Sequence, residues 1–118
     1  MAHGDITHLE IPVDDIPRAK TFYGAVFNWN IEDYPGYEDY PMWQAPNQIS
    51  GGALAPRSAE FSEPRSVIEV DSIDDTLSVI EASGGRTVMP KSPIDETSWW
   101  AIFEDTEGNQ LGLHERTG

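Results

Sequence analysis

A short internal repeat constrains the fold of this chain more than any other feature of its sequence. The motif Val13-Asp14-x-Ile16 ends one apolar run, and it returns 57 residues later as Val70-Asp71-x-Ile73 at the end of another. In both places a strand-like run passes into a helix-like segment. Self-similarity at a fixed offset, at the same structural junction, indicates two copies of one module.

The first copy begins with the alternating, β-branched residues 6–13, which predict a strand. Asp15 can cap a helix that starts near Pro17. We expect this helix to pack through an apolar stripe of Ala19, Phe22, Tyr23, Val26 and Phe27. Strands are expected at residues 29–34, 40–45 and 50–55. Gly51-Gly52 in the last of these indicates a bulge or a close approach of two backbones.

The second copy repeats this order. A strand at residues 65–70 leads to a helix capped by Ser72 and ended by Gly84-Gly85. The helix is expected to bury Ile73, Leu77 and Ile80, with Val79 as a further candidate. Strands at residues 86–89, 99–104 and 110–115 follow. The order βαβββ therefore occurs twice, over residues 5–56 and 64–116 of a single domain.

Charge and composition narrow the possible partners. The chain has 118 residues, of which 21 are acidic and seven basic, for a net charge of −14. Such a charge repels phosphate backbones and anionic lipids, so neither nucleic acid nor a membrane is an expected partner. The absence of Cys excludes disulfides and zinc thiolates. With no secretory or membrane-spanning pattern, we expect a cytoplasmic protein, either an ordinary acidic one or one adapted to high salt.

Strand alternation gathers polar side chains on the sheet face opposite the apolar one. The set comprises His8, Glu10, Arg65, Glu69, Gln110 and His114. If the sheets curl, these residues share a concave surface, which is where a small ligand binds; otherwise they line a solvated face. Trp43 is a candidate for an aromatic wall of the pocket, although core packing is the alternative. Adjacent Trp99 and Trp100 must point to opposite faces, so only one of them can do the same.

Several motifs in the sequence resemble those of a known superfamily. The run His8-x-x-Ile11-x-Val13-Asp14-Asp15-x-x-Arg18-Ala19-x-x-Phe22-Tyr23 is followed by Val70-Asp71-x-Ile73 with Gly84-Gly85, and by Asp105-x-x-Gly108-Asn109. In order and spacing these motifs resemble the glyoxalase, bleomycin-resistance and extradiol-dioxygenase superfamily, also called vicinal oxygen chelate, including its small lactoylglutathione-lyase-related proteins. The resemblance implies an α+β fold, in which two βαβββ modules form a cupped mixed sheet around a cavity with helices on the outer face. It also implies a homodimer and, often, a divalent metal held by one His or Glu from each of four strands.

The implied metal ligands are largely missing from this sequence. His8 occupies the first slot, but Arg65 and Gly112 occupy two others, and residues 41–59 contain no His, Asp, Glu or Cys for the fourth. A lone His cannot hold the ion, and a guanidinium adds a repelling charge. We therefore expect no metal cofactor. A rearranged site made from His8, Glu10, Glu69 and His114 is the alternative.

Three functions remain open. The first is a metal-free binding module for a small organic molecule. The second is a lyase, isomerase or other enzyme on a small carbonyl compound, with His8 as acid or base. The third is a regulatory or assembly domain with a vestigial cavity. A buried Arg65 needs either a carboxylate such as Glu10 or Glu69, or an anionic group of the ligand.

Overall fold

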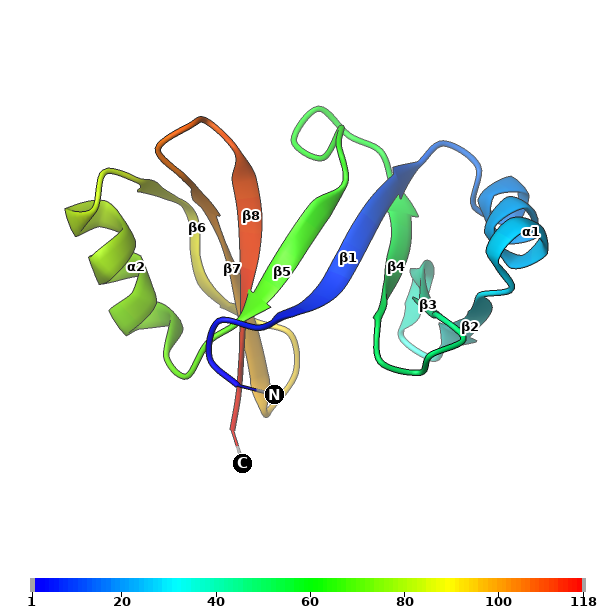
Figure 1. Cartoon of the computed structure of the whole chain (residues 1–118), viewed down its shortest axis with the longest axis horizontal. Coiled ribbons are helices and arrows are strands. Elements are labelled where there is room, and N and C mark those ends of the chain that lie inside the picture. Colours follow the sequence, from blue (N-terminus) through cyan, green and yellow to red (C-terminus); the bar gives the residue numbers. More distant parts are fainter. Residues whose placement is uncertain (1, 118) are drawn as a thin grey trace. The chain divides into compact units, whose positions relative to one another are not determined.

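The computed structural model describes residues 2–117 and confirms the α+β fold with two βαβββ modules (Figure 1). The first module contains β1 (Ile6–Val13), α1 (Ile16–Phe27), β2 (Asn30–Tyr34), β3 (Tyr37–Gln44) and β4 (Gly51–Pro56). The second contains β5 (Arg65–Glu69), α2 (Ile73–Ala82), β6 (Arg86–Pro93), β7 (Ser98–Glu104) and β8 (Gln110–Arg116). By their contacts the described residues divide into two compact units, the first made of residues 7–65 and the second of residues 2–6 and 66–117. Neither helix of this described region is long and apolar enough to cross a membrane.

In the first module the strands lie in the order β2-β3-β4-β1, with β1 parallel to β4 and the other neighbours antiparallel. The backbones of β1 and β4 approach closely where Leu9 is paired with Gly52. A Cβ atom at Gly52 would lie 1.8 Å from the carbonyl oxygen of Leu9, so this position accepts only glycine. The close approach predicted for Gly51-Gly52 is confirmed.

Helix α1 is held at both ends by local contacts. Asp15 accepts a hydrogen bond from the backbone N–H of Arg18 at 2.9 Å, as predicted, and Asn28 ends the helix in the left-handed conformation with a φ of 58°. Asn tolerates that conformation better than most residues. The helix therefore begins at a side-chain cap and ends at a left-handed residue whose backbone N–H donates to Gly24 O at 3.1 Å.

The predicted packing stripe of α1 is partly wrong. The helix contacts the core through Ile16, Ala19 and Tyr23, whereas Phe22, Val26 and Phe27 are each at least half exposed. The reason lies outside the helix, because Trp29 takes the space next to the sheet. Its ring stacks on buried Trp43 at a centroid distance of 3.7 Å and on Tyr23 at 4.9 Å. Apolar periodicity alone cannot show which aromatic residue fills the core.

In the second module the strands lie in the order β5-β8-β7-β6, with β5 parallel to β8. The core consists of residues from α2, from the segment before it and from the sheet face that the helix covers: Val70, Ile73, Leu77, Ala101, Phe103 and Leu113. Ile80 packs against this core, as predicted. Val79 is 64% exposed, so its candidate core position is wrong.

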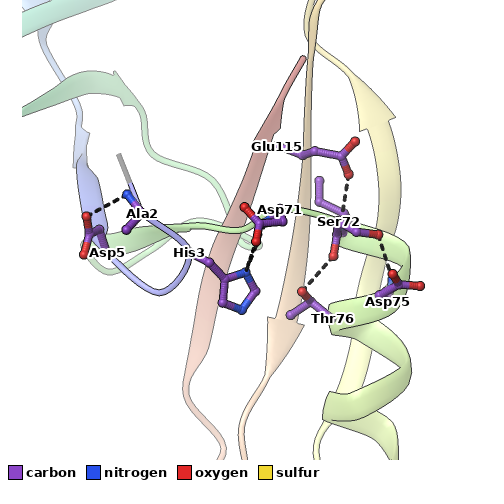
Figure 2. Close-up of polar contacts among 9 residues, drawn as sticks. Ala2, His3, Asp5, Asp71, Ser72, Asp75, Thr76 and Glu115 are labelled. Atoms are coloured by element: carbon purple, nitrogen blue, oxygen red, sulfur yellow. Dashed lines mark hydrogen bonds and ion pairs between the residues drawn. The ribbon is translucent and has the colours of Figure 1, made fainter. Parts of the chain in front are cut away.

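Several side chains accept hydrogen bonds from backbone N–H groups at the start of α2 (Figure 2). Ser72 Oγ accepts from the backbone N–H of Asp75 at 3.1 Å, which confirms the predicted cap. Glu115 reaches across from β8, and its Oε1 accepts from the backbone N–H of Ile73 at 2.7 Å. His3 Nδ1 accepts from the backbone N–H of Asp71 at 3.0 Å. Distant parts of the sequence therefore fix the strand-to-helix junction that the repeat marks.

Candidate functional site

A buried ion pair forms the base of a polar network in the first module. Arg65 donates from Nε and Nη2 to Oε1 of Glu10, at 3.0 and 2.9 Å. The two side chains are only 10% and 9% exposed, respectively. The guanidinium carbon also lies 4.7 Å from the centre of the Phe61 ring, a cation–π geometry. Of the partners left open for Arg65, the structure shows the carboxylate of Glu10.

Tyr40 of β3 extends this network to His8. Its hydroxyl donates to Oε2 of Glu10 at 2.6 Å, and His8 Nε2 lies 2.8 Å from the same hydroxyl oxygen. The rings of His8 and Tyr40 are nearly parallel, at an interplanar angle of 13°. Burial and, next, the negative charge of Glu10 raise the pKa of Tyr40 far above its ordinary value. Tyr40 therefore remains a neutral phenol that can donate one hydrogen bond.

The network lies on the face of the sheet opposite α1. Leu9 and Ile11 pack on the α1 side, and alternation along β1 places His8 and Glu10 on the other. Trp43 belongs to the α1 side, where it is 6% exposed and stacks on Trp29. The structure therefore does not bring Trp43 together with His8 and Glu10. Among the described residues, Trp43 Nε1 is buried without a hydrogen-bond partner.

Sequence reasoning missed Tyr40, although a signal for it was present. On β3, Tyr40 and Met42 alternate with Pro41 and Trp43, and the latter two are buried. Parity along this strand would have placed the Tyr40 hydroxyl on the face of Glu10. The strand was predicted to start at residue 40, three residues later than observed. Tyr40 was therefore placed at the end of a strand and was not considered as a member of the sheet face.

The second module contains its own paired titratable side chains. His114 Nδ1 lies 2.8 Å from Oε1 of Glu69, and the side chains are 17% and 12% exposed. The two residues are register partners on the parallel strands β5 and β8. Trp100 is the register partner of His114 on β7 and shares its face. Gln110, at the start of β8, is exposed and pairs in register with Glu104, so it does not join the Glu69–His114 pair.

A hollow of about 290 Å³ lies on the other side of the first module, next to α1. Its lining includes Val13, Arg18, Phe22 and Arg57. Arg57 is occupied there by Asp14 and by the backbone oxygens of Pro12 and Ser62. None of the predicted site residues lines this hollow, so it does not define the site.

Comparison with known sequences agrees with the fold. Residues 5–45 match the family model described as bleomycin resistance protein-like N-terminal. The chain is 26% identical to a glyoxylase-like domain-containing protein of Didymella fabae over 98% of its own length and 97% of that protein. It is 27% identical to a Mycobacterium bovis protein that carries a provisional glyoxylase name, over 89% of its own length, but it spans only 43% of that relative.

Solved structures show the same architecture. A methylmalonyl-CoA epimerase from Mycobacterium tuberculosis superposes with a TM-score of 0.74 at 17% identity, over 100% of this chain and 92% of that one. A glyoxalase/bleomycin resistance protein/dioxygenase superfamily member from Vibrio splendidus superposes with a TM-score of 0.65 at 11% identity, over 92% and 96%. The chain is therefore similar in sequence to bleomycin-resistance and glyoxylase-like proteins, and its fold is that of the glyoxalase/bleomycin resistance/dioxygenase structures. A further methylmalonyl-CoA epimerase, solved with methylmalonyl-CoA and NH4+, matches with a TM-score of 0.68 at 14% identity, over 99% of this chain and 97% of that one.

The divalent metal implied by this superfamily does not fit the residues of this chain. In the described part of the sequence, no three His, Cys, Asp or Glu side chains are grouped so that they could hold a metal. Glu10 already accepts from Arg65 and Tyr40, and the fixed positive charge of Arg65 opposes a cation beside it. At Gly112, a Cβ atom would lie 3.0 Å from Val67 Cγ2, so a longer ligating side chain there requires Val67 to move.

Proposed function

We propose that this protein binds a small organic molecule on the polar sheet face of the first module, with His8 as the contacting side chain. The observation that carries the proposal is the hydrogen-bonded chain Arg65–Glu10–Tyr40–His8. Tyr40 holds the imidazole of His8, and Tyr40 is itself held by Glu10, which is paired with Arg65. A site whose polar groups are ordered in advance loses less entropy when a ligand binds.

The Arg65–Glu10 pair also bears on the kind of ligand. The guanidinium already has a carboxylate and an aromatic ring as partners. An anionic ligand would have to compete with Glu10 for Arg65, and separating a buried pair leaves an uncompensated charge. We therefore assign Arg65 and Glu10 to the support of the site and assign ligand contact to His8.

Relatives suggest the first molecules to test, since a methylmalonyl-CoA epimerase of this fold was solved with methylmalonyl-CoA. The experiment is a thermal-shift and calorimetric screen with methylmalonyl-CoA, acetyl-CoA, benzoate and phenol as probes. A ligand at 100 times its dissociation constant stabilises the folded state by about 2.7 kcal/mol, which such a screen detects. Since we expect no metal in the site, EDTA should leave the binding unchanged.

The matched variants are His8→Ala and His3→Ala. His3 lies in the second unit and is half exposed, so its removal controls for the loss of an imidazole. We expect His8→Ala to abolish binding and His3→Ala to preserve it. Equal binding by both variants, or no binding by any probe, contradicts the proposal.

A second candidate function is acid–base catalysis on a small carbonyl compound, and one observation favours it. Tyr40 holds one nitrogen of His8 at 2.8 Å, which orients the ring as general bases are oriented in enzymes. The test is exchange of the hydrogen next to the thioester carbonyl of methylmalonyl-CoA in deuterium oxide, followed by mass spectrometry. Exchange that His8→Ala removes supports catalysis, and exchange no faster than in buffer leaves binding alone.

We also propose that the protein is a homodimer. Phe22, Val26 and Phe27 leave an apolar strip on α1 that is at least half exposed. Exposed apolar patches of this kind commonly mark protein interfaces.

A further inference from the structure

We propose that Tyr40 is the positioning residue that fixes neutral His8 in its Nε2–H tautomer, so that Nδ1 is the basic nitrogen of the site. The role of this tautomer in ligand binding rests on the proposed function. The position of the proton itself follows from the network.

The first step concerns the two oxygens of Glu10. Arg65 has five N–H donors and no acceptor, and both of the donors that reach Glu10 point at Oε1. The second oxygen, Oε2, is left to the hydroxyl of Tyr40. At 2.6 Å, the distance between Oε2 and this hydroxyl is typical of a phenol donating to a charged carboxylate. Glu10 accepts both donors of Arg65 as an ionised carboxylate, which has no hydrogen to donate to Tyr40.

The second step concerns the one hydrogen of the Tyr40 hydroxyl. If Tyr40 donated to His8 instead, two oxygen acceptors would face each other at 2.6 Å with no hydrogen between them. Loss of the phenolic proton is opposed by the burial of Tyr40 and by the charge of Glu10, both of which raise its pKa. Tyr40 therefore donates to Glu10, and its oxygen must accept from His8 Nε2 at 2.8 Å.

The consequence for ligand chemistry follows from the tautomer. In a neutral imidazole with a hydrogen on Nε2, Nδ1 carries the lone pair. A ligand group that binds His8 at Nδ1 must then supply the hydrogen, as a phenol or an enol does. A group that only accepts hydrogen bonds, such as an ether oxygen, is disfavoured at this atom.

The other two histidines, His114 and His3, have predictable tautomers with which His8 can be compared. His114 Nδ1 faces a carboxylate oxygen of Glu69, which can only accept, so neutral His114 carries its hydrogen on Nδ1. His3 Nδ1 accepts from the backbone N–H of Asp71, so neutral His3 carries its hydrogen on Nε2. His8 and His114 should therefore show opposite tautomers in one sample.

The test is two-bond ¹H–¹⁵N correlation spectroscopy of the three histidine rings, recorded without ligand at a pH where all are neutral. Signals are assigned by their loss in His8→Gln, His3→Gln and His114→Gln. Wild type should show His8 with a protonated Nε2. In Tyr40→Phe, which removes only the hydroxyl, His8 should change to a mixture of tautomers while His114 stays as it is.

Tyr34→Phe is the matched control, because the Tyr34 hydroxyl also donates to a glutamate, Glu32, at 3.0 Å, on an exposed part of the same module. It should leave His8 unchanged. A wild-type His8 protonated on Nδ1 overturns the proposal, and so does a Tyr40→Phe protein whose His8 keeps the wild-type tautomer. Should Tyr40→Phe fail to fold, a wild-type His8 protonated on Nδ1 would still overturn the proposal. Because no ligand is used, failure here is distinct from failure of the binding screen.

Discussion

Arg65 and Glu10 meet through a single carboxylate oxygen, because two nitrogens of the guanidinium, 3.0 and 2.9 Å away, donate to Oε1 alone. A bidentate pair would have used both oxygens of Glu10. The one-oxygen geometry is what leaves Oε2 for Tyr40 and so connects the ion pair to His8. Because each partner is nearly buried, loss of either one leaves the charge of the other without its partner.

Arg65→Met tests this dependence. The variant keeps much of the side-chain volume, removes the charge and leaves Glu10 buried without its cation. Breaking a buried pair in this way costs roughly 3–5 kcal/mol, so we expect a large fall in the free energy of unfolding measured with urea. The result also separates the two roles considered for Arg65, since a residue reserved for an anionic ligand would lose binding without losing stability.

Arg86→Met is the control for Arg65→Met. Arg86 also pairs with a glutamate, Glu104, through two nitrogens, but its side chain is 60% exposed. Exposed pairs contribute at most about 1 kcal/mol. Equal effects of the two variants would mean that Arg65 is solvated and that the polar network is not buried.

The sequence predicted the fold well because the features that set it are local. Alternation over residues 6–13, the cap at Asp15 and the cap at Ser72 each require only neighbouring residues, and all three are confirmed. The exposed side of α1 was predicted wrongly because it depends on Trp29, which reaches the core from outside the helix. Long-range packing of this kind leaves no periodic signal.

The site was predictable only in part. Strand parity placed His8 and Glu10 on one face, and the cost of burying a guanidinium predicted either a carboxylate or an anionic ligand as the partner of Arg65, of which the structure shows the carboxylate of Glu10. Parity does not say which strands lie side by side. It could therefore place Tyr40 on the face of Glu10, but it gave no reason to expect a contact between residues 30 positions apart in the sequence and separated by β4, nor one between Glu115 and Ile73.

Two glycine substitutions should have opposite effects on stability. Gly52→Ala places a Cβ atom 1.8 Å from the Leu9 carbonyl oxygen, so β1 and β4 must separate, and we expect a protein that does not fold. Gly24→Ala is in the helix α1, where a Cβ atom would be no closer than 3.9 Å to Trp29. It should stabilise the protein by about 0.5–1 kcal/mol through helix propensity. Thermal unfolding by circular dichroism distinguishes the two, and a folded Gly52→Ala protein would contradict the β1–β4 geometry.

The proposed dimer should depend on the apolar strip of α1. At micromolar concentration and moderate salt, we expect sedimentation equilibrium to return twice the 13.1 kDa mass of the chain. Replacing Phe22 and Val26 together by Ser should give the monomer, whereas Val79→Ser, at an exposed position of α2, should not. Low salt should weaken the dimer, because a charge of −14 on each chain is then poorly screened. A wild-type protein that sediments only as the monomer contradicts this prediction.

Glu115 should make the protein sensitive to acid. The backbone N–H of Ile73 and, to a smaller extent, Lys91 hold the pKa of its carboxyl below the ordinary value of 4.5. A group whose pKa is lower in the folded state contributes stability at pH values above its unfolded pKa, and this contribution is lost as the pH falls through the folded pKa. We expect Glu115→Gln to cost about 1 kcal/mol at pH 7, since a negative charge at the start of α2 is removed. Below pH 4.5 the difference between wild type and variant should shrink, as followed by urea unfolding at several pH values.

Glu96→Gln, an exposed change in the loop before β7, should give a curve parallel to wild type. A Glu115→Gln curve that is also parallel would mean that Glu115 does not act on α2 through its charge.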